Sequence, residues 1–216
     1  MSIKLYGYWR SSAAYRVRLA LNLKSLEYET VPVSLLPGDS EHRQEAYRAR
    51  NPQMLVPFLE DGDFGTGQSQ AILEYLEEAY PDPALLPKGK EARAVVRSFC
   101  SSICCDIHPL NNLRVLLYLK EEFGVSDEQR DDWYAHWIHE GFRSAELTAL
   151  EHAGSGPFVF GESVTLADTC LIPQIYNARR FNVPLDDYPR LAAIDQHCNS
   201  LSEFVNALPE NQADCA

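Results

Sequence analysis

The first eighty residues alternate between strand-like and helix-like patterns of apolar and polar positions. Ala13, Val17 and Leu21 recur at intervals of four, which predicts an amphipathic helix around them. Pro32 cannot donate a hydrogen bond to a sheet ladder, so the strand that contains it is expected at an edge. The expected elements are a strand over 3–8, a helix over 12–24, a strand over 28–33, an irregular segment, strands over 56–60 and around 64, and a helix over 69–80.

Beyond residue 80 the pattern becomes helical. Three prolines and a glycine between residues 81 and 89 predict a short linker. Apolar residues at helical spacing run from 93 to 123, and Pro109 is expected to kink this helix. Ser126 to Gln129 and Thr165 to Asp168 are capping-box patterns, which predict the starts of two more helices. Asp168 is therefore expected to be structural.

Composition narrows the class of protein. The chain has 216 residues, of which 45% are hydrophobic and 23% charged, as in ordinary globular proteins. Its formal net charge of -12 argues against nucleic acid and anionic membranes as partners. No apolar run is long enough to span a bilayer, and the start lacks the apolar segment of a secretory signal. The six cysteines are irregularly spaced, which favours reduced thiols in the cytoplasm over a disulfide framework, and no metal site is expected.

Two serines lie where the first strand is expected to turn into a helix. The N–H groups at a helix start have no partner within the helix, and the hydroxyls of Ser11 and Ser12 can cap it. The same hydroxyls can donate a hydrogen bond to a thiolate. The helix dipole adds about 0.3–1 kcal/mol for an anion at this end, so the segment can lower the pKa of a bound thiol. A cap with no further role explains the serines equally well.

Two further segments offer groups to a ligand. A cis Val56–Pro57 bond would turn the backbone N–H and C=O of Val56 outward, ready to pair with an extended peptide, whereas a trans bond would make Pro57 an ordinary turn residue. Ser69 is expected to cap the helix that follows. With Gln68 and the N–H groups of that helix start, Ser69 would form an anion site suited to a carboxylate.

Taken together in this order, the three segments resemble the glutathione site of the cytosolic glutathione transferases, and of their zeta class in particular. The resemblance extends from about residue 5 to residue 208, and it is carried by the runs 11–18, 51–57, 68–69, 106–112, 165–168 and 177–181. It implies an α/β plus all-α fold. A thioredoxin-like domain (βαβαββα) would occupy residues 1–81, a linker 82–90, and an all-helical bundle 91–216.

The resemblance also implies a reaction. Glutathione would be the cofactor and its thiolate the nucleophile, acting on a small dicarboxylic keto acid such as 4-maleylacetoacetate. Addition to the double bond allows rotation, and elimination then gives the trans isomer, 4-fumarylacetoacetate. This cis–trans isomerisation belongs to tyrosine and phenylalanine catabolism. The resemblance further implies a homodimer in the cytoplasm.

Individual residues receive roles by the same resemblance. Arg10, beside the serines, is the first choice for binding a substrate carboxylate, because a guanidinium pairs with a carboxylate bidentately. Arg180 matches a substrate-contacting arginine of the family. Catalysis would rest on Ser11, Ser12 and Arg10. The residues implied to contact glutathione are Ser11, Ser12, His42, Val56, Gln68, Ser69, His108, Asn112 and Arg114.

The sequence departs from the family pattern in places. Ala13 stands where the zeta class usually has cysteine, so that cysteine cannot be a required nucleophile here, and Ala14 replaces a serine. The family often has glutamine at His42 and His108. Three alternatives stay open: the shorter substrate maleylpyruvate, a general transferase acting on other electrophiles, and a noncatalytic glutathione- or partner-binding protein. The presence of all three motifs weighs against the last.

Overall fold

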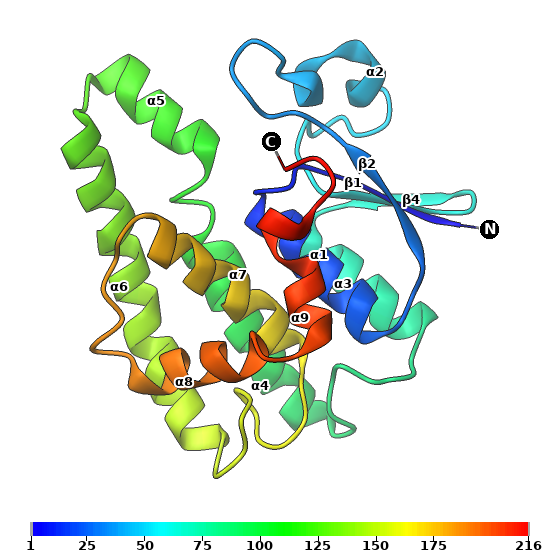
Figure 1. The fold of residues 1–216 in the computed structure, drawn as a ribbon, viewed down its shortest axis with the longest axis vertical. Coiled ribbons are helices and arrows are strands. Elements are labelled where there is room, and N and C mark those ends of the chain that lie inside the picture. The colour runs from blue at the N-terminus through cyan, green and yellow to red at the C-terminus, as the bar shows by residue number, and fades with distance from the viewer. Residues whose placement is uncertain (1, 216) are drawn as a thin grey trace. The chain divides into compact units, whose positions relative to one another are not determined.

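The computed structural model describes residues 2–215, which pack into two compact units (Figure 1). The first unit comprises residues 2–85 and 199–215, and the second comprises Leu86–Cys198. The elements of the first unit are β1 (Ile3–Gly7), α1 (Ser12–Leu23), β2 (Tyr28–Pro32), the 3-10 turn η1 (Glu41–Arg43), α2 (Glu45–Arg48), β3 (Phe58–Asp61), β4 (Phe64–Gly67), α3 (Ser69–Ala79), α9 (Ser202–Ala207) and the 3-10 turn η3 (Pro209–Asn211). The βαβαββα order predicted for the first domain is confirmed.

The four strands form one mixed sheet in the order β2-β1-β3-β4. β1 pairs with β2 in parallel, and the other two pairs are antiparallel. Pro32 lies in the edge strand β2, as predicted. β3 begins at Phe58, two residues later than the pattern suggested, and follows the cis Val56–Pro57 bond.

Both faces of this sheet are covered. Leu5 lies opposite Leu59 and Tyr6 opposite Phe58, and successive residues of a strand point to opposite faces. Tyr6 and Phe58 join Tyr47 of α2 in one apolar cluster. α1 packs against α3, and α3 also contacts β3 and β4 (Figure 1). The sheet therefore holds the starts of α1 and α3 in fixed positions within the unit.

The C-terminal residues group differently from the expected helical domain over 91–216. α9 packs on α1 and belongs to the first unit. The Arg18 guanidinium donates from Nε to the Ala207 carbonyl at 3.1 Å, and the Asn22 amide donates to the Glu203 carbonyl at 3.0 Å. These long-range bonds from α1, which hydrophobic periodicity cannot indicate, account for the difference.

A buried ion pair ties α1 to α3 and to the segment after it. Lys24 Nζ lies 2.9 Å from a Glu77 carboxylate oxygen, and both side chains are almost fully buried. The same ammonium donates to the carbonyls of Tyr80 (2.8 Å) and Pro83 (2.9 Å). Glu77 also accepts from the Leu85 N–H at 2.9 Å. All three ammonium protons therefore have acceptors, which is the condition for a buried cation to be tolerated.

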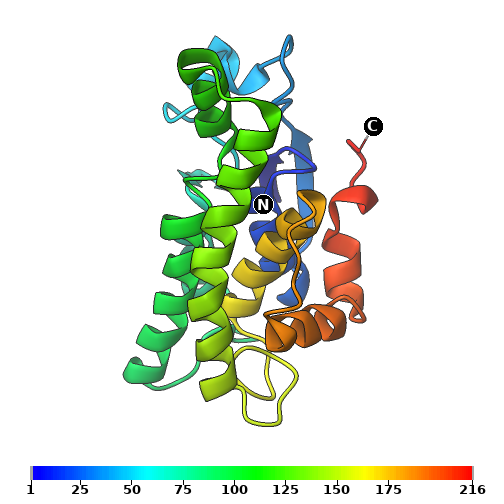
Figure 2. The ribbon, with the colours of Figure 1, turned by 90° about the vertical axis from the view of Figure 1, so that its left-hand side faces the viewer.

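The second unit is built from helices. They are α4 (Lys90–Ser101), the π-helix η2 (Ser102–Ile107), α5 (Leu113–Phe123), α6 (Asp127–His152), α7 (Leu166–Arg180) and α8 (Pro189–Cys198). α6 runs along the unit as its longest helix (Figure 2) and packs on η2, α5 and α8. α7 packs against α4, η2 and α8. The fold class predicted from sequence, α/β followed by all-α, is confirmed.

Two helix predictions need correction. Residues 93–123 do not form one kinked helix: α4 passes into η2, the chain turns over 108–112, and α5 begins after Asn112. Pro109 falls in that turn, where its missing N–H costs no helical bond. Ser69 is the first residue of α3 rather than its cap, and the N-cap residue Gln68 makes no side-chain capping bond.

Both capping boxes are present as predicted. Ser126 accepts from the Gln129 N–H at the start of α6, and Thr165 and Asp168 bond reciprocally at the start of α7. Asp168 is fully buried and accepts from the N–H groups of Val159 (2.9 Å) and Thr165 (2.8 Å) and from the Thr165 hydroxyl (3.1 Å). Asp168 thus joins the start of α7 to the loop before it.

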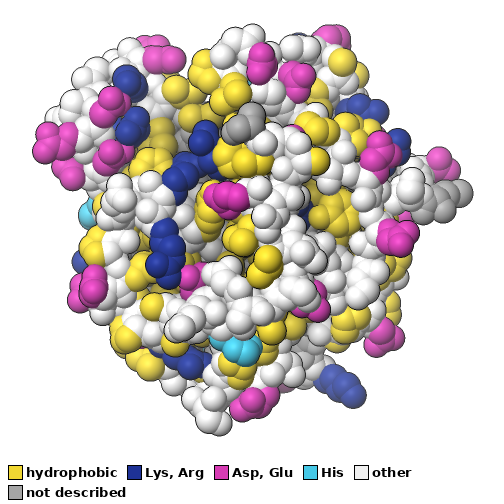
Figure 3. Space-filling view, viewed as in Figure 1, with side chains coloured by type: hydrophobic (Ala, Val, Ile, Leu, Met, Phe, Trp, Pro, Cys, Tyr) yellow, Lys and Arg dark blue, Asp and Glu magenta, His cyan; other side chains and the backbone are white. Residues whose placement is uncertain are grey.

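The surface carries mixed charges. Over the end of the second unit where α5 meets α6, acidic and basic side chains lie interspersed (Figure 3). Lys120 and Arg130 both pair there with Asp127, in exposed bonds that water and salt screen strongly. Within residues 2–215, no helix is both long and apolar enough to cross a membrane.

Candidate functional site

The start of α1 presents a serine hydroxyl, as predicted. Ser11 is the N-cap residue, with extended backbone angles, and its Oγ accepts from the Ala14 N–H at 3.3 Å. A hydroxyl that accepts in this way keeps its own proton for a second partner. Ser12 is the first helical residue and is only 6% exposed, whereas Ser11 is half-buried. Of the two predicted residues, Ser11 is the better placed to meet a ligand.

The loop before α1 is held from two directions. The Trp9 N–H donates to the Asp214 carboxylate at 3.0 Å, and the Trp9 carbonyl accepts from Arg18 Nη2 at 2.9 Å. Arg10 lies with its guanidinium carbon 5.0 Å from the centroid of the Trp9 ring. These contacts orient the loop that carries Arg10 and Ser11.

The Val56–Pro57 bond is cis, which decides between the two interpretations of Pro57 in favour of a shaped loop. The Leu55 carbonyl just before it accepts from the Tyr47 hydroxyl and from the Asn51 amide, both at 2.7 Å. The backbone N–H and C=O of Val56 make no hydrogen bond to any residue that the structure describes. The segment is thus fixed by its neighbours, and its own polar groups remain for a ligand.

The start of α3 adjoins this loop. Gln68 has a positive φ of 66° and donates from Nε2 to Gln53 Oε1 at 2.8 Å. Ser69 is buried and its Oγ accepts from Arg16 Nη1 at 3.2 Å. Ser69 is the first residue of α3, and the N-terminal end of a helix is an arrangement that favours carboxylates and phosphates. The structure therefore brings together the start of α1, the 51–57 loop and the start of α3 within one unit.

His42 lies in η1 of the same unit and is half-buried. Its Nδ1 is 3.4 Å from the Ser34 carbonyl oxygen. Burial is the largest influence on this imidazole and lowers the pKa of His42 below its ordinary value, so the neutral form is favoured near neutral pH. A neutral imidazole can still donate one hydrogen bond to a ligand.

The remaining predicted residues lie in the second unit. Asn112 caps α5, with its side-chain oxygen accepting from the Arg114 N–H at 3.1 Å, and Arg114 is exposed. His108 lies at the end of η2. Arg180 ends α7, with its guanidinium carbon 4.8 Å from the centroid of the Phe181 ring. That these residues meet those of the first unit around one ligand stays a prediction.

Arg179, the neighbour of Arg180, is engaged in an ion pair. Its Nη2 and Nε lie 2.7 Å and 3.2 Å from the Asp195 carboxylate. Arg179 therefore has a structural role, joining the end of α7 to α8. That Arg180 binds the substrate stays a prediction.

Sequence reasoning missed Arg16. This residue lies on α1 among the apolar positions Ala13, Val17 and Ala20, and it is 1% exposed. The only available signal was a charged residue at the spacing of the apolar stripe, which periodicity treats as an interruption rather than as a contact to the next helix. Its bond to Ser69 makes it part of this site.

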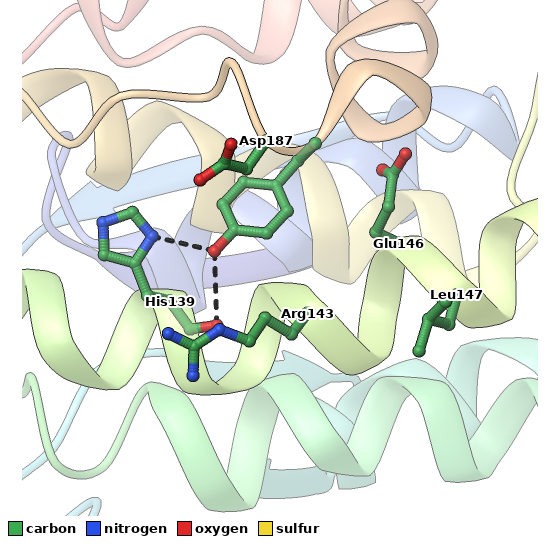
Figure 4. A pocket seen from close by; sticks show the side chains of 6 residues that line it. His139, Arg143, Glu146, Leu147 and Asp187 are labelled. Carbon is green, nitrogen blue, oxygen red and sulfur yellow. Dashed lines mark hydrogen bonds between the residues drawn. The ribbon is translucent and has the colours of Figure 1, made fainter.

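One pocket of the second unit is lined by none of the predicted residues. His139, Arg143, Glu146 and Leu147 of α6 line it together with Asp187 and Tyr188 (Figure 4). The Tyr188 hydroxyl lies 2.8 Å from His139 Nδ1 and closes one side. The pocket has a volume of about 530 Å³ and is widely open. Its mixed charges and its openness do not define a reaction.

Comparison with known proteins agrees with this geometry. Residues 5–84 match the family described as glutathione S-transferase, N-terminal domain. A probable maleylacetoacetate isomerase of Vibrio cholerae is 47% identical over 99% of both chains. The holo structure of a maleylpyruvate isomerase, described as a bacterial glutathione S-transferase in Zeta class, has a TM-score of 0.95 and 45% identity, covering 99% of this chain and 100% of that one. A maleylacetoacetate isomerase from Methylobacterium extorquens AM1, solved with bound malonate and GSH, has a TM-score of 0.93 and 37% identity over 99% of both chains.

A thioredoxin-like unit with these three segments, joined to an all-helical unit, defines a glutathione transferase fold. The sequence identities of 47% and 45% over almost the whole length narrow the assignment from glutathione transferases in general to their zeta class. The chain belongs to the zeta-class glutathione transferase family, which includes the maleylacetoacetate isomerases.

Proposed function

We propose that this protein is a glutathione-dependent cis–trans isomerase that converts 4-maleylacetoacetate to 4-fumarylacetoacetate. The observation that carries the proposal is the arrangement of three segments in one unit: the Ser11 cap, the backbone of Val56 without hydrogen bonds to described residues, and the buried Ser69. Similarity over the whole chain to proteins named for this activity supports the choice of substrate.

The first unit suits an extended peptide that carries a thiol and carboxylates. Val56 would pair with the peptide backbone as a short added strand. Ser69 and the α3 start would bind a carboxylate. Ser11 and the α1 start would face the thiol. Gln68 and His42 would contribute further hydrogen bonds at the edges of the ligand.

Glutathione, when bound, supplies a thiolate that adds reversibly to an activated double bond and so permits rotation. The task of the chain is to hold that sulfur as an anion. The Ser11 hydroxyl, which accepts from Ala14 on one side, would donate to the sulfur on the other, and the α1 dipole favours the anion by about 0.3–1 kcal/mol. Ser12 would support the turn from its buried position.

The substrate would be bound through its carboxylates. Arg10 lies next to Ser11 in the chain and is oriented by Trp9, so its guanidinium would engage the end of the substrate nearest the sulfur. Arg180 would engage the other end, with His108, Asn112 and Arg114 lining the space near the thiol. These donors would also stabilise negative charge as it develops on the substrate.

A second candidate, maleylpyruvate isomerisation, uses the same residues on a shorter substrate. The observation in its favour is the similarity, at a TM-score of 0.95, to a maleylpyruvate isomerase. We further propose that the protein acts as a homodimer in the cytoplasm, in the breakdown of tyrosine and phenylalanine. The resemblance to the zeta-class family supports the homodimer, the cytoplasmic location and the pathway.

The test is an isomerisation assay with purified protein on both maleyl substrates, with and without glutathione. The proposal predicts turnover that needs glutathione and does not consume it, with a higher kcat/KM on maleylacetoacetate. A higher value on maleylpyruvate would select the second candidate. Net consumption of glutathione would indicate a general transferase, and no turnover on either substrate would contradict both isomerase proposals.

The matched variants are Arg10→Ala and Arg179→Ala. Loss of the Arg10 guanidinium is expected to raise KM for the maleyl substrate by about tenfold or more, with glutathione affinity nearly unchanged. Arg179→Ala removes a structural partner of Asp195 and is expected to leave both values within about twofold. Equal loss of substrate and glutathione binding in Arg10→Ala would refute the substrate role of Arg10.

A further inference from the structure

Arg16 is a buried cation with an incomplete set of partners. It is 1% exposed, and only Nη1 is engaged, in the 3.2 Å bond to Ser69 Oγ. Nε and Nη2 are buried and have no hydrogen-bond partner, and no carboxylate among residues 2–215 pairs with this guanidinium. A buried charge without a counter-charge is costly, so such a group requires an explanation.

The other buried cations of the same unit are satisfied. Lys24 pairs with Glu77 and donates to two carbonyls. Arg18, two residues further along α1, donates to the carbonyls of Ala207 and Trp9. Arg16 is therefore an exception within its own helix, and a general tolerance of buried charge does not account for it.

The bond to Ser69 has a definite direction. A guanidinium has donors only, so Ser69 Oγ must be the acceptor, and its hydroxyl proton is left for another acceptor. Ser69 is also the first residue of the eleven-residue helix α3, whose N-cap residue makes no side-chain capping bond. Three features thus converge on one point: a buried positive charge, a hydroxyl donor and the N-terminal end of a helix, whose dipole favours negative charge. All of them favour an anion.

We propose that Arg16 is the positioning residue for a carboxylate of the ligand at the start of α3. This inference rests on the proposed function, since the carboxylate would be one of the two that glutathione carries. The carboxylate would accept from the Ser69 hydroxyl and from the N–H groups of α3. Arg16 would lie behind Ser69, orient its hydroxyl and supply the counter-charge. The ligand in turn would neutralise a charge that the unliganded fold leaves uncompensated.

The test compares glutathione with two analogues by titration calorimetry. One analogue, 4-aminobutyryl-cysteinyl-glycine, lacks the carboxylate of the γ-glutamyl residue but keeps the amine. The other, γ-glutamyl-cysteinyl-glycinamide, lacks the terminal carboxylate. The variant Arg16→Met is expected to bind glutathione about tenfold or more weakly than the wild type. For the analogue that lacks the carboxylate bound at the start of α3, Arg16→Met and the wild type should have equal affinity, because the interaction with Arg16 is absent from both complexes.

Arg18→Met is the matched control, because it removes a buried arginine of the same helix that donates to the Ala207 and Trp9 carbonyls of the fold. It is expected to lower the melting temperature and to change affinity for all three ligands by the same factor. Arg16→Met should instead leave the melting temperature of the unliganded protein unchanged or raised. Arg16→Lys keeps the charge and should recover part of the glutathione affinity, and this variant carries the test if Arg16→Met does not fold.

The outcomes separate the two proposals. If the wild type does not bind glutathione, the proposed function fails. If the wild type binds and Arg16→Met binds equally well, or loses the same factor towards all three ligands, the role of Arg16 is overturned while the proposed function stands. A fall in the melting temperature as large as that of Arg18→Met, with unchanged affinity, would assign Arg16 to the fold and also overturn the inference.

Discussion

Replacing Asp168 with alanine is expected to destabilise the second unit strongly. The side chain is fully buried and accepts from the N–H groups of Val159 and Thr165, at 2.9 Å and 2.8 Å, as well as from the Thr165 hydroxyl. Alanine would leave both N–H groups buried without partners. Each unsatisfied group costs about 1–3 kcal/mol, so the expected loss is about 2–6 kcal/mol in the free energy of unfolding. For a chain of this size, each kcal/mol lowers the melting temperature by about 2–4 °C, so it should fall by about 4–24 °C.

The contribution of Asp168 to the stability of the fold depends on pH, and the direction of this dependence follows from its pKa. Burial is the largest influence and raises the pKa of Asp168 from 3.8 to about 6, while its hydrogen bonds with Val159 and Thr165 act in the opposite direction. The folded state therefore binds this proton more tightly than the unfolded state. The resulting stabilisation is fully present below about pH 4 and is lost as the pH rises through about 6.

Denaturant unfolding of the wild type and Asp168→Asn at pH 7 and pH 4 measures this effect, because asparagine does not titrate. Between pH 7 and pH 4, the free energy of unfolding of the wild type should rise relative to that of the variant by about 2 kcal/mol. Asp186→Asn, which alters an exposed carboxylate, is the control and should shift the unfolding midpoint little at pH 7. The reasoning would be refuted if Asp168→Ala lowered the free energy of unfolding by less than about 1 kcal/mol. It would also be refuted if the wild type became less stable relative to Asp168→Asn when the pH is lowered from 7 to 4.

Three further results are expected. Lys24→Met should lower the free energy of unfolding by about 3–5 kcal/mol, because it leaves Glu77 charged and buried. The double variant with Glu77→Leu should recover part of that loss, and additive losses in denaturant unfolding would contradict the coupling. Gly141→Ala should destabilise the packing of α6 on η2, because the added methyl would overlap the Ile107 side chain. Adding Ile107→Ala should relieve part of the loss, and an unchanged melting temperature for Gly141→Ala alone would argue against this close approach. Ser11→Ala should lower kcat about a hundredfold, and loss of the cap should lower the melting temperature by about 2–4 °C; activity equal to that of the wild type would remove Ser11 from the mechanism.

The sequence predicted the fold well wherever its patterns are local. The order of elements in the first unit, the edge position of Pro32 and both capping boxes could be inferred because periodicity, a missing N–H and a spacing of three residues act within a few positions. The break between α4 and α5 was missed. Ile103 and Ile107 continue the apolar spacing through η2, so the pattern does not register the change to a π-helix.

Long-range contacts explain the other differences. α9 joins the first unit through bonds from Arg18 and Asn22, more than 180 positions away along the chain. The burial of Arg16 and its contact with Ser69 depend on how α1 packs on α3. The position of Ser11 as a cap was predictable, but its greater accessibility relative to Ser12 appears only in the folded chain.

The account depends most on the claim that the start of α1 holds the sulfur of glutathione as an anion beside Ser11. The direct measurement is an ultraviolet titration of the thiolate of glutathione bound to the wild type and to Ser11→Ala. The account predicts that the bound thiol of the wild type ionises well below the pH at which free glutathione does, and that the variant loses most of this shift. A bound thiol that titrates like free glutathione in the wild type would contradict it.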